Sequence, residues 1–166
     1  MSQKVAKMRA AIANPLNTHN FLVNIPEFGE YNFLVQSAAL PGVSARFTQL
    51  FIAGEQVAWP TVPEYGHVWN CKLPENDAGT MRKLIDQLWA KYWDEKTGKM
   101  LVNALNPFQT ISVTMRDLND NPVFSFYLRN AWLEGWDDIA LDQSQPATSA
   151  VWSLKFHYDY FDKGTE

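Results

Sequence analysis

The sequence predicts a mainly β fold in which two packed antiparallel sheets form a sandwich or partial barrel, with one flanking α-helix. Residues 150–161 (AVWSLKFHYDYF) alternate large apolar and polar side chains, which is the pattern of a long strand buried on one face. Shorter strand-like runs recur along the chain between glycine, proline and asparagine residues. The one long stretch with apolar residues at helical spacing is 80–96.

The first part of the chain is predicted to hold a short helix and a hairpin. Residues 2–13 favour a basic helix, which Pro15 ends. Residues 19–25 (HNFLVNI) and 31–37 (YNFLVQS) indicate two strands, and the proline and glycine between them favour a turn. We therefore expect these two strands to pair.

A second hairpin is predicted where residues 47–53 and 56–59 flank Gly54. The next strand, 68–73 (VWNCKL), places Trp69, Cys71 and Leu73 on one side. Cys71 is therefore expected to be a small buried hydrophobic residue rather than a nucleophile.

The flanking helix is predicted over 80–96, with Asn76 or Asp77 capping its start and its end near Gly98. Its apolar residues recur at helical spacing. They are Met81, Leu84, Ile85, Leu88 and Tyr92.

The remaining strands are predicted at 110–115 and 123–132, around a turn at 119–122, and a longer connection follows over 133–146. The closing strand is expected to turn five aromatic or aliphatic side chains inward. They are Trp152, Leu154, Phe156, Tyr158 and Tyr160.

Composition narrows the class of protein. The 166 residues are 46% hydrophobic, which suits one domain spanning 1–166 with a sizeable core. A formal net charge of −4 argues against a protein that wraps nucleic acid. A single cysteine excludes an internal disulfide and fits a reducing compartment, and no segment is long and apolar enough to cross a membrane. We expect a protein made in the cytoplasm with no membrane insertion.

No pattern for catalysis, metal or cofactor binding emerges from the sequence. His19, His67 and His157 are far apart and lack metal-ligand spacing. Asp117 opens a calcium-loop-like run, but Pro122 stands where that loop requires glycine, so we expect a turn. There is no glycine-rich phosphate loop. We therefore expect no enzyme activity and no cofactor.

The order of several motifs resembles the tail tube proteins of contractile-tailed bacteriophages. These motifs are Asn14-Pro15-Leu16 with the strand that ends at Ile25, the segment Ala39-Leu40-Pro41-Gly42, the strand pair around Gly54, and the closing run from Trp152 to Phe161. The resemblance covers nearly the whole chain. It implies a fold shared with the tubes of type VI secretion systems and tailocins. It also implies a virion protein whose six copies join sheet edges into a ring around an inner barrel, and whose rings stack into a hollow tube.

The resemblance also implies partners and surfaces. The partners are the tail sheath, the baseplate and tail terminator proteins, and DNA that passes through the lumen without specific binding. The hairpin around Gly54 would supply contacts between subunits, through Gln49, Phe51, Glu55 and Gln56. For Phe51 a place in the subunit's own core is an equally good interpretation. The N-terminal segment 1–15 carries Lys4, Lys7 and Arg9, which either order on an adjacent ring or stay in a loose tail.

Two further surfaces follow from the same resemblance. The outer helix would touch the sheath through Lys83, Asp86, Gln87 and Asp94, although a solvated face also explains these residues. The polar side of the closing strand would line the lumen, through Ser153, Lys155, His157 and Asp159. Lys155 and His157 fit poorly with an acidic wall that does not retain DNA.

Two alternative functions remain open. A tube initiator or terminator of the same tail would share the fold. A carbohydrate-binding β-sandwich is more distant, and the seven tryptophans, which could stack on sugar rings, favour it.

Overall fold

The computed structural model describes residues 18–103, 107–144, 146 and 148–164. Its elements, in chain order, are β1 (Phe21–Asn24), the 3₁₀ helix η1 (Pro26–Leu34), β2 (Ser37–Ala38), β3 (Val43–Ile52), β4 (Glu55–Tyr65), β5 (Val68–Pro74), α2 (Thr80–Tyr92), β6 (Gln109–Arg116), β7 (Pro122–Trp136), β8 (Val151–His157) and β9 (Tyr160–Gly164). This confirms the predicted antiparallel sandwich with a flanking helix, and the sheets do not close into a barrel.

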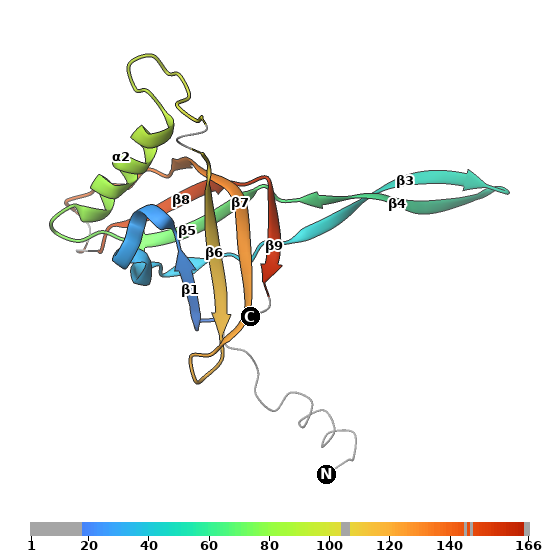
Figure 1. The fold of residues 1–166 in the computed structure, drawn as a ribbon, viewed down its shortest axis with the longest axis horizontal. Helices are drawn as coiled ribbons and strands as arrows, with labels where there is room; N and C mark the ends of the chain where they lie inside the picture. The colour runs from blue at the N-terminus through green and yellow to red at the C-terminus, as the bar shows by residue number, and fades with distance from the viewer. Residues whose placement is uncertain (1–17, 104–106, 145, 147, 165–166) are drawn as a thin grey trace, which may run out of the picture.

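The main sheet has the strand order β1-β6-β7-β8-β5-β2, and β9 also pairs with β7. Every strand pairing in it is antiparallel. The first half of β7 pairs with β6 and β9, whereas its second half pairs with β8. The long strand β7 therefore belongs to both halves of the sheet, which enclose the core between them (Figure 1).

The strand β7 bends where it passes from one half of the sheet to the other. At the bend, two successive buried residues, Leu128 and Ala131, are three positions apart instead of two. The spacing of two then returns with the buried Leu133. Asn130, between Leu128 and Ala131, has a φ of 55°. A left-handed residue breaks the alternation of faces, and asparagine tolerates that conformation better than most residues.

The closing run bends beside it, so the single strand predicted over 150–161 is wrong in one respect. It forms two strands, β8 and β9, separated at Tyr158 and Asp159. Up to Tyr158 the predicted inward residues are buried or half-buried, but Tyr160 is 45% exposed. The bend shifts the alternation by one residue, so that Phe161 packs against the core in place of Tyr160.

The predicted strand at 31–37 is also wrong, because the structure places η1 there. Pro26 occupies the first turn of η1, and Gly29 breaks it with a φ of 50°. The buried Asn32 amide accepts a hydrogen bond from the Ile25 N–H (2.8 Å) and donates one to the Ile25 carbonyl (3.0 Å). These bonds curl the segment back on itself, so β1 pairs with β6 rather than with a neighbouring hairpin strand.

The predicted hairpin around Gly54 is confirmed and is longer than expected. Strands β3 and β4 pair only with each other among the described strands and extend away from the sandwich as a two-stranded ribbon, which we call the arm (Figure 1). Ala53 and Gly54 at its tip both have positive φ, 53° and 87°. That combination is typical of the two-residue turn that matches the twist of a hairpin.

The flanking helix α2 ends at Tyr92, four residues before the predicted end. Met81, Ile85, Leu88 and Tyr92 are buried in the same core as the sheets, as the spacing predicted. After the helix, Asp94 closes a turn by accepting hydrogen bonds from Lys96 and Thr97, so Asp94 does not lie on the helix.

The main cap of α2 is Glu75, which precedes both of the predicted caps in the sequence. The Glu75 carboxylate accepts hydrogen bonds from the backbone N–H groups of Met81 (3.0 Å) and Arg82 (2.9 Å) and from the Trp152 indole (2.8 Å). Of the two predicted caps, Asn76 accepts one from Thr80 (3.0 Å). Glu75 therefore joins the start of the helix to β8.

Two other predicted local features, the buried Cys71 and the turn at Asp117, are confirmed. Cys71 is buried, and burial raises the pKa of its thiol to about 12. The Asp117 carboxylate accepts hydrogen bonds from the backbone of Asn119 (2.7 Å) and Asn121 (3.0 Å), which makes this segment a tight turn. No helix in the described part of the chain is long and apolar enough to cross a membrane.

We predict that Glu75→Gln lowers the free energy of unfolding by about 2 kcal/mol at neutral pH, because a charged cap is lost. Burial alone would raise the pKa of Glu75, but its hydrogen bonds outweigh burial and hold the pKa below its usual value. The stabilisation by Glu75 is therefore complete above the pKa of the unfolded chain and is lost as pH falls through the folded value.

Urea unfolding at pH 7 and at pH 3 measures this effect, with Asp77→Asn as a matched control in the same exposed turn. The difference in the free energy of unfolding between wild type and Glu75→Gln should be smaller at pH 3 than at pH 7. A gap of the same size at both pH values would contradict the assignment of the cap.

Candidate assembly surface

The arm exposes apolar side chains on both of its faces. The β3–β4 register places Phe47, Gln49 and Phe51 on one face, opposite Pro60, Ala58 and Gln56. The other face carries Thr48, Leu50 and Ile52, opposite Trp59, Val57 and Glu55. Every residue of β3 is exposed, and Phe51 reaches 78%. A two-stranded ribbon with no packed face is marginally stable alone, so this surface is suited to being covered.

All four inter-subunit residues predicted in the hairpin lie on this arm, and three of them share a face. Gln49, Phe51 and Gln56 share one face near the tip, whereas Glu55 lies on the other face. Among the described residues nothing packs over Phe51, so its interpretation as a core residue is wrong. Lys4, Lys7 and Arg9 lie outside the described residues.

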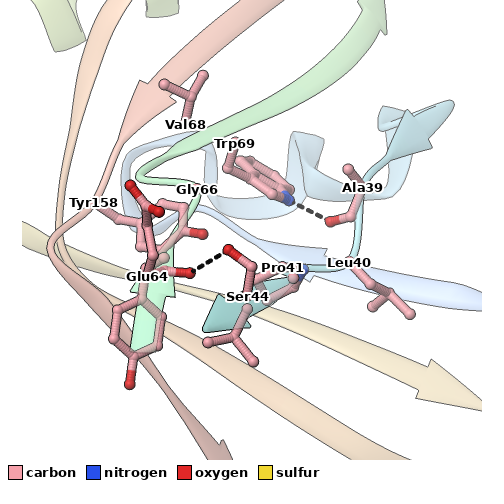
Figure 2. Close-up of a pocket in the computed structure, with 12 residues that line it drawn as sticks. Ala39, Leu40, Pro41, Ser44, Glu64, Gly66, Val68, Trp69 and Tyr158 are labelled. Carbon is pink, nitrogen blue, oxygen red and sulfur yellow. Dashed lines mark hydrogen bonds between the residues drawn. The ribbon is translucent and has the colours of Figure 1, made fainter. Parts of the chain in front are cut away.

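A groove of about 570 Å³ lies where the arm meets the sandwich (Figure 2). The residues that line it come from the chain entering the arm, 39–44, and the chain leaving it, 64–69, together with Tyr158. Leu40, Val43 and Val68 give it an exposed apolar lining. We call this feature the root groove.

The outer side of α2 presents the predicted sheath-facing residues Lys83, Asp86 and Gln87, all of them exposed. Asp86 pairs with Arg82 one turn earlier (3.0 Å), and the Lys83 ammonium donates to the Ala78 carbonyl. Asp94 is half-buried, and its hydrogen bonds from Thr97 and the backbone lower its pKa. Of the four predicted residues, Asp94 is therefore the one that does not belong to this helical face.

The predicted lumen-facing residues of β8 share the side of the sheet opposite Leu154 and Phe156. Lys155 donates to Asp137 (2.6 Å), and this hydrogen bond and charge raise the pKa of Lys155. His157 stacks on His67, with ring centroids 5.8 Å apart, and lies 3.9 Å from Glu134. His67 and His157 are 90 positions apart in the chain, and no sequence pattern indicates that they would be adjacent.

Asp159 lies in the bend between β8 and β9 and accepts a hydrogen bond from the Asn130 amide (2.7 Å). The side of the sheet that carries Lys155 and His157 thus also holds Glu134 and Asp137, which were not selected from the sequence. Their contacts with Lys155 and His157 place these carboxylates there. Glu134 lies at the irregularity in the β7–β8 register and Asp137 follows the end of β7, which the sequence alone does not indicate.

Comparisons with known proteins establish the fold. No protein-family model matches the sequence, and no curated protein sequence is similar to it. Solved structures are similar. A chain from the sheath–tube complex of an extracellular contractile injection system, PVC, in the extended state has a TM-score of 0.65 at 12% identity, with 96% of this chain and 97% of that chain covered.

Two other assemblies contain similar chains. A chain from the PVC sheath/tube terminator has a TM-score of 0.66 at 12% identity, covering 93% of this chain and 99% of that one. A chain from the baseplate of the anti-feeding prophage has a TM-score of 0.64 at 14% identity, covering 90% and 95%. The chain therefore shares its fold with chains of contractile injection system assemblies, in agreement with the predicted resemblance.

We predict that Phe51→Ser changes the free energy of unfolding of the monomer by less than about 0.5 kcal/mol, because Phe51 contacts no core residue. Leu154→Ala, in the buried face of β8, should cost about 2–5 kcal/mol. Urea unfolding at a concentration where the protein is monomeric compares the two variants. A loss above 1 kcal/mol for Phe51→Ser would show that the arm folds back on its own sandwich.

Proposed function

We propose that this chain is the subunit of a tail tube in a contractile particle, in which six copies close a ring and the rings stack around a lumen. The observation that carries the proposal is the arm: both of its faces are apolar and exposed on a chain with a tube-protein fold. A monomer with such a surface would aggregate, whereas a tube covers it with neighbouring copies.

The edges of the sheet support the same function. Among the described strands, β1 pairs only with β6, and β9 only with β7. Each of these strands therefore leaves one row of backbone N–H and C=O groups for another chain to pair with, and ring closure removes such edges. The sheath would contact the exposed side of α2 through Lys83, Asp86 and Gln87, and the baseplate would bind the first ring.

In this proposal the polar side of β7 and β8 lines the lumen, with Ser153, Lys155, His157 and Asp159. The charge of Lys155 is neutralised there by Asp137, and Glu134 and Asp159 add further negative charge. Lys72, opposite Ser153 in the register, lies on the same side, so three carboxylates stand against two lysines. A wall with this small excess of negative charge would let DNA pass without retaining it. The pairing removes the poor fit of Lys155 that the sequence suggested.

A second candidate is a tube terminator, because a chain of the PVC sheath/tube terminator is as similar as the chain of the sheath–tube complex, with TM-scores of 0.66 and 0.65. The fold therefore does not separate the two roles. Assembly does: a tube subunit stacks without limit, whereas a terminator forms one ring.

Negative-stain electron microscopy of the purified protein tests the proposal. We expect six-fold rings or tubes of uniform bore, because apolar arms and free sheet edges both need partners. Single rings that never stack would favour the terminator. A monomer that persists at high concentration would contradict both functions.

We also predict that assembled Asp137→Asn protein binds duplex DNA at low salt several-fold more tightly than wild type, because Lys155 loses its partner. Filter binding across a salt series measures it, since phosphate contacts weaken steeply with salt. Asp138→Asn, a change of equal charge at the exposed neighbouring residue, is the control. Equal DNA binding by the two variants would argue against Lys155 lining the lumen.

A further inference from the structure

Two histidines from distant parts of the chain stack on each other where the arm joins the sandwich. The rings of His67 and His157 have centroids 5.8 Å apart and an interplanar angle of 12°. Gly66 and His67 form the link between the end of β4 at Tyr65 and the start of β5 at Val68. His157 is the last residue of β8 and pairs with Val68 in the sheet. The stack therefore joins the link through which the chain leaves the arm to the sandwich.

Tyr158 holds this link in place. His67 has a positive φ of 56°, which a residue other than glycine adopts only with support from its surroundings. The backbone N–H of Tyr158 donates to the His67 carbonyl (2.9 Å), and His67 Nδ1 donates to the Tyr158 carbonyl (3.1 Å), because a carbonyl only accepts. A proton taken up by His67 therefore adds to Nε2. The ring cannot move away from His157 without breaking its bond to Tyr158 and releasing the link.

We propose that His67 and His157 form a pH-sensitive latch: the uncharged stack holds the arm in one direction, and protonation of both rings releases it. Imidazole is the side chain that ordinarily changes its charge between about pH 5 and pH 8. Two uncharged rings stack without electrostatic cost, whereas two imidazolium rings at this separation repel each other. This inference does not depend on the proposed tube, because the latch and the arm belong to one chain.

A single carboxylate stands beside His157. Glu134 on β7 has an oxygen 3.9 Å from His157 Nδ1, and the uncharged ring of Trp132 lies against His157 with centroids 5.3 Å apart. Lys155, two residues earlier on β8, pairs with Asp137 (2.6 Å). Glu134 can therefore balance the first proton that the stack takes up.

In the described part of the chain, His67 has no ion pair of its own. The Glu64 carboxylate on β4 attracts His67 but already pairs with Arg46 (2.6 Å). Asp159, in the bend beyond His157, accepts a hydrogen bond from Asn130 (2.7 Å). A second proton on the stack is therefore opposed by the first, with no carboxylate reserved for it. Uncharged side chains of β4, β5 and the bend complete the surroundings: Tyr65, Val68, Asn70 and Tyr158.

Pulsed electron paramagnetic resonance tests the latch by measuring how widely the direction of the arm varies. Spin labels on Glu55→Cys at the arm tip and Val123→Cys on the sandwich, both exposed, report the spread of tip-to-sandwich distances. The labelled chain is diluted into an excess of unlabelled protein, so that only distances within one chain are measured. Cys71 can stay in place, because it is buried.

With the native histidines, we expect the spread of distances to be about twofold wider at pH 5 than at pH 7.5, because both rings are charged at the lower pH. His67→Asn and His157→Phe should each remove this widening. Asparagine tolerates the positive φ and can donate to Tyr158, and phenylalanine keeps a ring in the stack. His19→Asn, at an exposed histidine outside the stack, is the control and should widen as the native chain does.

An unchanged spread in the chain with native histidines would overturn the latch. The same widening in His67→Asn and His157→Phe would also overturn it, because the sandwich itself would then respond to acid. Loss of the widening in His19→Asn would assign the response to a different histidine. These outcomes are independent of whether rings or tubes form, since every distance is measured within one chain.

Discussion

The constraint on which the rest depends is that a two-stranded ribbon has no interior. The arm places large apolar side chains such as Phe47 on one face and Trp59 on the other, and the sandwich of the same chain covers neither. Burial of apolar surface is the main favourable term in folding and association. A chain that keeps this much apolar surface on an extended arm is suited to association, and in the proposed tube other copies of the chain would cover that surface.

The sandwich is built to hold that arm in a fixed direction. The bend in β7 joins the two halves of the main sheet, and Glu75 fastens α2 to β8. Trp69 packs in the core and hydrogen-bonds to Ala39, so the chain that enters the arm is fixed by the core itself. One side of this bent sheet is polar, and there Asp137 neutralises Lys155. The exposed side of α2 forms a separate surface.

Much of the fold could be predicted because its patterns are local. The alternation in 68–73 and 110–115, the helical spacing from Met81 to Tyr92 and the turn at Gly54 all correspond to observed elements. The predictions that were wrong depend on contacts between residues distant in the chain, or on side chains that hydrogen-bond to backbone groups in place of a neighbouring strand. The Asn32 side chain hydrogen-bonds to the backbone of Ile25, so the predicted strand at 31–37 does not form. At Asp159 the chain bends although the alternation of apolar and polar residues continues, so Tyr160 is exposed instead of buried.

The site was harder to predict than the fold, for a physical reason. An apolar strand looks the same in sequence whether it packs against its own sheet or against another copy, so Phe51 was ambiguous until its exposure was known.

The most direct test is hydrogen exchange of the backbone amides of 43–65 in dilute and in assembled protein. If neighbouring copies cover the arm, its amides should exchange fast in the dilute protein and be strongly protected after assembly. The amides of β6 should stay protected in both states. Equally fast exchange of the arm in both states would contradict the central claim.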